Sequence, residues 1–484
     1  MFERPILPLS VRTLGCWLVL AASALPVGAG YGGGFGTAES PYLIFTAGQL
    51  DALGMTPGDW GRHFKLMADI DLKDYGPDEF HVIGTSEDEP FTGVFDGNHK
   101  TISNLRLVCE FGAWFGLFGL VSGDDARIEN LTLVNPSVAA EIGRYVGALA
   151  GGLELASVVN CHVRAGSIQA FSHVGGLVGK NDGGTILGCT VAALVQGTSR
   201  VGGLAGQSYF GVVERCRTEI EVLAPLSSYW IGGLVGEVRE ATVRECRARG
   251  TATGDVCVGG LAGENYMGVI ERCCTAGAVS GSTNVGGILG LNSGGAVGDC
   301  YATAGVKATT CAGGLVGCNG PSCHCTVYEA GVVNRCYAAG PVSGASSGGL
   351  VGTDDRGKVF HSFWDIKASG CATSAGGDGK TASQMTTASL YLSAGWDFVA
   401  EKANGIEEIW YMPGAGGCPR LVWELADGDL NADTQVDFRD FSWLAAQWRQ
   451  ADTREWVSEG YAAPDGVVDI DDLARFADVW LAGR

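Results

Sequence analysis

Short apolar stretches bounded by glycine recur along most of the chain. The clearest is a hexapeptide of the form Val-Gly-Gly-Leu-Val-Gly, and its copies start at Val146, Val174, Val201, Ile231, Val258, Val285, Ala312 and Ser347. Successive starts are 28, 27, 30, 27, 27, 27 and 35 residues apart, and a divergent copy begins at Phe115. A fixed period of this length indicates a repeat architecture in which each unit is one supersecondary element.

The unit from Val258 to Asn284 shows what such a repeat contains. We expect strands at VGGLAG, VIERCC and AVSG, separated by turns at ENYMG, TAG and STN. These apolar stretches are too short for helices and are rich in β-branched residues and glycine. One unit cannot bury its own apolar face, so neighbouring units must stack on each other. The sequence therefore predicts an all-β fold, a parallel β-solenoid of about ten coils.

A second series of residues keeps the same period: Cys161, Cys189, Cys216, Cys246, Cys273, Cys300 and Cys336. We favour a buried column of small apolar thiols. Disulfides between adjacent coils are the alternative, because neighbouring strands lie within the Cα separation that a disulfide requires.

Charge and the N-terminus bear on the location and partners of the protein. The formal net charge of −21 disfavours nucleic acid and anionic membranes as partners. Residues 1–29 resemble a signal peptide, with Arg4 and Arg12 before the apolar stretch Leu14–Leu25 and a cleavage-type sequence at Val27–Ala29. A lipoprotein signal ending at Cys16 is the weaker alternative. We expect a secreted or cell-surface protein with no later membrane span.

These repeats resemble the GLUG motif, which is found in bacterial surface and secreted proteins. The stretches Pro41–Thr46, His63–Leu72 and Phe91–Asn98 are similar to the opening coils of such proteins, and the resemblance covers Gly34 to about Leu425. It implies a right-handed β-helix but no settled activity.

Both ends of a solenoid need covering, because they expose core and unpaired strand edges. Thr46 and Gln49 predict the N-terminus of a short helix that covers the first coil with Leu50 and Leu53. We therefore expect the following order: signal peptide (1–29), N-terminal cap and first coils (30–134), repeat solenoid (135–359), C-terminal cap (360–425) and a calcium-binding module (426–484).

The calcium module is predicted from oxygen ligands at the spacing of an EF-hand loop. The ligands at positions 1, 3, 5, 7, 9 and 12 are Asp429, Asn431, Asp433, Gln435 (through its carbonyl), Asp437 and Asp440. Thr434 replaces the glycine that is usual at position 6.

A shift of 32 residues superposes this loop on a second copy, in which the retained acidic positions are Asp465, Asp469 and Asp472. Tyr461 and Ala463 occupy its positions 1 and 3, so we expect one good Ca²⁺ site and one weak or vacant site. The tandem copies resemble a type I dockerin, which implies a cohesin-like partner. An acidic, solvated tail is the alternative.

Three further groups of residues have the composition of a functional site. Cys318, Cys323 and Cys325 with His324 could bind zinc, although a local disulfide is favoured. An acid–base group of Asp69, Asp71, Asp96 and His99 is interpreted as structural. The string Gly344–Gly348 matches G-x-S-x-G but lies in a turn-rich stretch without a following helix.

No catalytic residue is assigned. We favour a non-catalytic binding or adhesion protein for polysaccharide, cell-surface glycan or protein. A polysaccharide lyase or glycoside hydrolase on a β-helix scaffold is the alternative.

Overall fold

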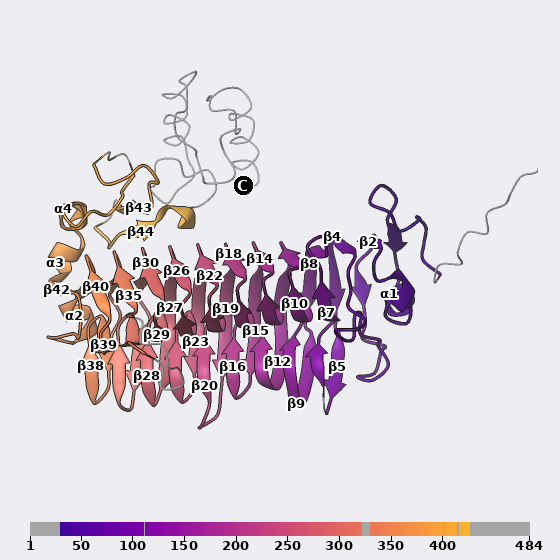
Figure 1. Ribbon diagram of the computed structural model, residues 1–484, viewed down its shortest axis with the longest axis horizontal. Coiled ribbons are helices and arrows are strands. Elements are labelled where there is room, and N and C mark those ends of the chain that lie inside the picture. Colours follow the sequence, from indigo (N-terminus) through magenta and orange to yellow (C-terminus); the bar gives the residue numbers. More distant parts are fainter. Residues whose placement is uncertain are drawn as a thin grey trace, which may run out of the picture.

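The computed structural model describes residues 30–425, apart from residues 111, 322–329, 400, 402 and 414–415. The chain forms a rod-shaped parallel β-solenoid in which successive coils add strands to the same ladders (Figure 1). The predicted all-β solenoid is confirmed. The α-helices lie at the ends of the rod.

One side of the rod is a parallel sheet of nine strands. These are β7 (Phe118–Ser122), β10 (Ala150–Glu154), β13 (Val178–Asp182), β17 (Ala205–Tyr209), β21 (Val235–Arg239), β25 (Ala262–Tyr266), β29 (Leu289–Ser293), β34 (Val316–Asn319) and β39 (Val351–Asp354).

Three further series of strands complete the coils. The series that follows the nine-stranded sheet along the chain contains β8 (Arg127–Val134), β11 (Ser157–Val159), β14 (Thr185–Leu187), β18 (Val212–Glu214), β22 (Thr242–Arg244), β26 (Val269–Glu271), β30 (Ala296–Gly298), β35 (Val332–Asn334) and β40 (Lys358–Phe360). The next contains β12 (His162–Gly175), β15 (Thr190–Gln196), β19 (Arg217–Leu223), β23 (Arg247–Thr253), β27 (Cys274–Gly281), β31 (Tyr301–Ala302), β32 (Gly305–Ala308), β36 (Tyr337–Ala338), β37 (Val342–Ser343) and β41 (Phe363–Asp365). The last contains β6 (Ala113–Phe115), β9 (Ser137–Gly147), β16 (Ser199–Gly202), β20 (Tyr229–Gly232), β24 (Val256–Gly259), β28 (Thr283–Gly286), β33 (Cys311–Gly313) and β38 (Ser346–Gly348). The first coils are built from β1 (Tyr42–Ile44), β2 (His63–Leu66), β3 (Ile70–Asp71), β4 (Val94–Ser103) and β5 (Arg106–Cys109).

The hexapeptides are aligned in space as they are in sequence. Val174 pairs with Val201, Val201 with Ile231, and the same register continues to Ser347. Phe115 pairs with Val146, so the divergent copy is a true member of the series.

The hexapeptide is not one strand, contrary to our expectation. It spans a corner, because Val258 and Gly259 end β24 and Ala262 begins β25. A Cβ atom on Gly260, at this corner, would overlap the carbonyl oxygen of Gly287 in the next coil. The glycine pair therefore allows the chain to turn while adjacent coils remain in contact. The expected turns ENYMG and TAG were also wrong in part, since they lie largely within β25 and β27.

The cysteine column is buried inside the rod, as predicted, and none of the described cysteines forms a disulfide. The amide of Cys273 donates to Sγ of Cys300 and that of Cys300 to Sγ of Cys336, each at 3.4 Å. Ser362 continues the column, because its hydroxyl accepts from the amide of Cys336. Burial raises the pKa of the Cys161 thiol to about 12.

A second polar column, which sequence analysis missed, runs inside the nine-stranded sheet. The Asn265 carboxamide donates to Asn292 at 3.1 Å, Asn292 donates to Asn319 at 3.0 Å, and Asn319 donates to Asp354 at 3.1 Å. All three asparagines are fully buried. The column thus gives each buried carboxamide nitrogen an acceptor, whereas Oδ1 of Asn265, at its start, has no hydrogen-bond partner.

The N-terminal cap agrees with the prediction. Helix α1 (Ala47–Gly54) covers the first coils, and Leu50 and Leu53 are fully buried. The Thr46 side chain accepts from the Gln49 amide, whereas the Gln49 side chain accepts from the Phe45 amide at 2.7 Å. A short 3-10 helix, η1 (Pro57–Asp59), follows.

The segment expected to close the far end does so only in part. We call residues 366–425 the C-terminal lobe; it contains α2 (Ile366–Ser369), β42 (Asp378–Lys380), α3 (Ala382–Met385), α4 (Ala388–Leu392), β43 (Trp410–Tyr411), β44 (Arg420–Leu421) and η2 (Val422–Glu424). Its helices lie near the end of the rod, whereas β43 and β44 lie against the flank (Figure 1).

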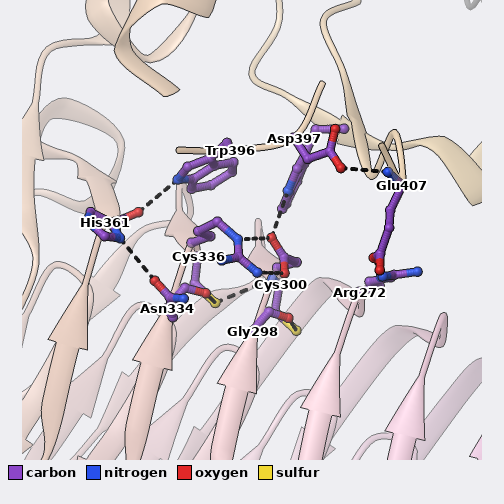
Figure 2. Close-up of polar contacts among 12 residues, drawn as sticks. Arg272, Gly298, Cys300, Asn334, Cys336, His361, Trp396, Asp397 and Glu407 are labelled. Atoms are coloured by element: carbon purple, nitrogen blue, oxygen red, sulfur yellow. Dashed lines mark hydrogen bonds and ion pairs between the residues drawn. The ribbon is translucent and has the colours of Figure 1, made fainter. Parts of the chain in front are cut away.

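Figure 2 shows how the lobe is attached to the flank. The Trp396 indole donates to the carbonyl oxygen of His361 at 2.9 Å, and Arg272 forms an ion pair with Glu407. Trp396 and Trp410 belong to a second apolar core, separate from that of the solenoid, which also contains Tyr337. Among the described residues, no helix is long and apolar enough to cross a membrane.

Candidate functional site

The outer face of the nine-stranded sheet carries large polar and aromatic side chains in register. One column contains Lys180, Gln207, Glu237 and Glu264, which pair from β13 to β25. The next column contains Asp182, Tyr209, Arg239 and Tyr266. Because parallel strands place equivalent residues directly above each other, each column runs along the rod.

A third column flanks this face, formed by the residue before each hexapeptide. Its members include Trp114, Tyr145, His173, Arg200 and Trp230, and all have left-handed backbone conformations, with φ between 51° and 61°. Such conformations are disfavoured for residues other than glycine. The Trp114 and Tyr145 rings stack at 4.3 Å, and the His173 ring lies 4.6 Å from that of Tyr145.

Cations connect the two aromatic columns. Lys180 Nζ lies 5.9 Å from the centre of the Tyr145 ring and 5.8 Å from that of Tyr209. The Arg239 guanidinium lies 4.7 Å from the Tyr266 ring. These distances are within the range of cation–π attraction.

Carboxylates balance these cations. Glu237, whose side chain is 3% exposed, accepts from Arg200 Nε at 2.5 Å and from Gln207 at 2.7 Å. The Arg200 guanidinium also lies 4.2 Å from the Trp230 ring, so Arg200 contacts both the carboxylate of Glu237 and an aromatic ring. The network fixes the outward side chains, which lowers the entropy cost of binding a ligand there.

We call this surface the aromatic face, and its residues are Trp114, Tyr145, Lys180, Arg200, Tyr209, Trp230, Glu237, Arg239 and Tyr266. At its edge, the Phe210 ring lies 4.1 Å from that of Tyr209 and is 54% exposed. Leu155 and Met267 are also exposed along this edge. The face therefore combines planar apolar surface with fixed hydrogen-bonding groups.

His173 lies within this network as a neutral group. Burial, and then the charges of Arg200, Lys180 and Arg144, lower its pKa to about 3. Its Nδ1 lies 2.8 Å from the hydroxyl oxygen of Ser172.

The residues singled out in the sequence have different locations. All predicted calcium ligands, from Asp429 to Asp472, lie outside the described residues. So do Cys323, His324 and Cys325. Within the part of the chain that the structure describes, no group of three or more His, Cys, Asp and Glu side chains is arranged to hold a metal ion.

In the acid–base group interpreted as structural, the three aspartates contact residues of neighbouring coils. Asp69 accepts from the Thr101 amide, Asp71 from Asn104, and Asp96 pairs with Lys65 at 2.7 Å. The string Gly344–Gly348 lies at β38 and is followed by strand β39, so it lacks the helix that a nucleophile elbow requires.

The strand ladders of its own structure define the chain as a parallel β-solenoid repeat protein. No family model matches it. Halomucin of Haloquadratum walsbyi is 33% identical over 217 residues, which cover 43% of this chain and 2% of halomucin. A "Putative Gly-rich membrane protein" of Evansella cellulosilytica is 37% identical over 125 residues, 25% of this chain and 14% of that protein. The chain thus spans a small part of the length of these curated relatives.

Matches among solved structures have low TM-scores. The crystal structure of a "putative immunoglobulin A1 protease" from Bacteroides ovatus has a TM-score of 0.35 and 20% identity, over 81% of this chain and 95% of that chain. A structure described as "IgA1 Protease" has a TM-score of 0.31 and 14% identity, over 60% of this chain and 21% of that chain. Likeness at this level carries no argument about activity.

Proposed function

We propose that the protein is a secreted or cell-surface, non-catalytic binding protein whose aromatic face binds polysaccharide or cell-surface glycan. The supporting observation is the set of aligned columns on the nine-stranded sheet, in which rings alternate with ionic and amide groups. Aromatic rings offer flat apolar surface, and charged and amide groups offer hydrogen bonds to hydroxyls.

The repetition favours a polymer as the ligand. Neighbouring coils are about 4.8 Å apart, so an extended chain along the rod would meet similar groups on each coil. Contacts that are weak singly add up when several are made by one linked ligand. The larger of the two cavities described, about 80 Å³, is well below the roughly 300–1,000 Å³ of small-molecule pockets and lies elsewhere.

The C-terminal tail completes this proposal. Asp429, Asn431, Asp433, Asp437 and Asp440, with the carbonyl of Gln435, would bind Ca²⁺ in a dockerin-like module. The module would attach the solenoid to a cohesin-like partner, so that glycan binding and anchoring reside in different parts of the chain.

A glycan array probed with the mature chain tests the proposal. We expect binding to a restricted set of polysaccharides, reduced about tenfold by Tyr209→Ala combined with Phe210→Ala. Phe171→Ala is the matched control, because Phe171 is also exposed but lies on β12, outside the aromatic face. No glycan binding, or equal binding by all variants, would refute the proposal.

A polysaccharide-degrading enzyme remains the second candidate, for which one observation is specific. Glu237 and Glu264 lie in register on adjacent coils of the aromatic face, and both are buried. Paired carboxylates about 5 Å apart are the arrangement of retaining glycosidases. Release of reducing ends or unsaturated products from a bound polysaccharide, abolished by Glu264→Gln, would favour this candidate over binding alone.

A further inference from the structure

A small cavity lies between the flank of the solenoid and the C-terminal lobe. Its volume is about 80 Å³. Arg247 and Arg249 of β23 and Tyr301 of β31 line it from the solenoid, and Arg420 and Glu424 line it from the lobe. We call it the arginine cavity.

The register of the strands creates the space. Arg247 and Arg249 are two residues apart on β23, so their side chains leave the same face of the strand. Their partners on the next coil are Cys274 and Ala276, both small. Two long side chains therefore lie beside two short ones, and Arg420 and Glu424 of the lobe border the resulting hollow, in which Arg249 stays exposed.

Positive charge dominates the cavity. Glu424 is its only lining carboxylate, against three guanidinium groups. Arg420 lies 4.0 Å from Glu424. Among the described residues, no carboxylate lies within ion-pair distance of Arg247 or Arg249. A net positive site is notable in a chain whose formal charge is −21.

The hydrogen bonds inside the cavity leave the arginines as its available donors. The Tyr301 hydroxyl donates to the Glu424 carboxylate, with oxygen distances of 2.8 and 2.9 Å. The hydroxyls of Thr275 and Thr303 donate to the carbonyl oxygens of Gly287 and Thr275. The guanidinium groups of Arg247 and Arg249 have no side-chain partner among the described residues, so their N–H donors are available, and such planar donors suit oxyanions.

We propose that the arginine cavity binds an oxyanion, either a carboxylate or a sulfate group. The volume of about 80 Å³ exceeds the roughly 10–15 Å³ that one water molecule needs, so the cavity has room for a group of several heavy atoms. The oxyanion would be a free small anion or the acidic group of a larger polymer. This site is separate from the aromatic face and does not depend on the proposed glycan binding there.

Calorimetric titration of the full chain with sodium sulfate and with sodium glucuronate, at constant ionic strength, tests the site. We expect one site per chain, with affinity at least about tenfold weaker in the Arg247→Gln, Arg249→Gln double variant. The matched control is Arg164→Gln, because Arg164 is an exposed arginine on β12, three strands earlier in the same series.

The double variant must keep the wild-type circular dichroism spectrum and melting temperature. The Arg247→Lys, Arg249→Lys double variant, which keeps the positive charges, should recover part of the affinity. A wild-type protein that binds neither anion, or a Gln variant that binds as tightly as wild type, would overturn the proposal.

Two polymer titrations identify the source of the oxyanion. Tighter binding of polyglucuronate or of a sulfated glycan than of the free anions, lost in the double variant, would assign the cavity to a polymer. Binding of the free anions alone would assign it to a small anion. The Gln double variant and the wild type should have equal affinity for a neutral dextran. A difference in dextran affinity would contradict an oxyanion site.

Discussion

The Arg335 guanidinium makes two hydrogen bonds to the Asp299 carboxylate, from Nε at 2.8 Å and from Nη2 at 2.6 Å. The Asp299 side chain is 7% exposed and also accepts from the Trp410 indole at 3.2 Å. One carboxylate thus joins two coils of the rod to the C-terminal lobe.

We expect Asp299→Asn to destabilise this junction by about 2 kcal/mol, because Arg335 loses a charged partner in a half-buried setting. Urea unfolding followed by tryptophan fluorescence measures the change, since Trp396 and Trp410 lie in the lobe. Asp378→Asn is the control: its ion pair with Lys380 is exposed and should contribute less than about 0.5 kcal/mol. Equal effects of the two substitutions would contradict the role given to Asp299.

The corner glycines give a second prediction. Gly260→Ala should cost about 2 kcal/mol or more, because its Cβ would overlap the backbone of the neighbouring coil. Gly298→Ala is the matched control, since the structure leaves open space around that position, and we expect a change within about 0.5 kcal/mol. Thermal unfolding of both variants measures the difference. A Gly260→Ala protein as stable as wild type would show that the corner is looser than described.

The pKa of His173 gives a prediction on pH. In the unfolded chain this imidazole takes up a proton below about pH 6.5, whereas the pKa in the folded protein is about 3. Unfolding therefore binds a proton in this window, so His173 reduces stability as the pH falls from about 6.5 to 3. We expect His173→Gln to remove about 4 kcal/mol of the acid-induced loss, measured as the difference between two stability–pH curves.

His99→Gln is the control for that experiment. His99 is exposed and has a similar left-handed backbone, with φ of 57° against 53° for His173, so any backbone cost of glutamine is matched. If both variants change the curve equally, burial of His173 is not the cause.

The calcium loop gives a fourth prediction. Asp429→Ala should weaken Ca²⁺ binding by at least about tenfold, because position 1 supplies a direct carboxylate ligand. Asp465→Ala in the second, degenerate loop should have a much smaller effect. Calorimetric titration of the full chain with CaCl₂ checks both variants, and unchanged binding by Asp429→Ala would refute the ligand assignment.

The register of the strands could be predicted because the same hexapeptide recurs mostly every 27 or 28 residues. The same alignment could have revealed the asparagine column: Asn181, Asn265, Asn292 and Asn319 each lie seven residues after the start of a hexapeptide. It could also have shown the residue before each hexapeptide, where Trp114, Tyr145 and Trp230 form part of the aromatic face. Both columns consist of residues at positions that do not belong to the apolar hexapeptides from which the repeat was recognised.

Other features could not be predicted from repeats. The hexapeptide was taken as one strand, since its apolar residues fit a strand and the corner depends on contact between Gly260 and the next coil. The arginine cavity joins Arg247 to Arg420 and Glu424, which are far away in sequence and outside the repeats. A repeat pattern indicates which residues of neighbouring coils lie side by side. The position of the lobe, by contrast, depends on packing between residues far apart in the sequence.

The asparagine column has a direction: each carboxamide donates to the following coil, and Asp354 ends the series as an acceptor. Interior members are interchangeable, because Asn292 could lie opposite Val238 on the neighbouring coil as Asn265 does now. Excision of the whole segment 258–284 would then bring Val285 opposite Ile231 and Cys300 opposite Cys246, and would remove Arg272, one of the residues that hold the C-terminal lobe. The length of the rod is thus open to change by gain or loss of whole units, while its thickness is fixed.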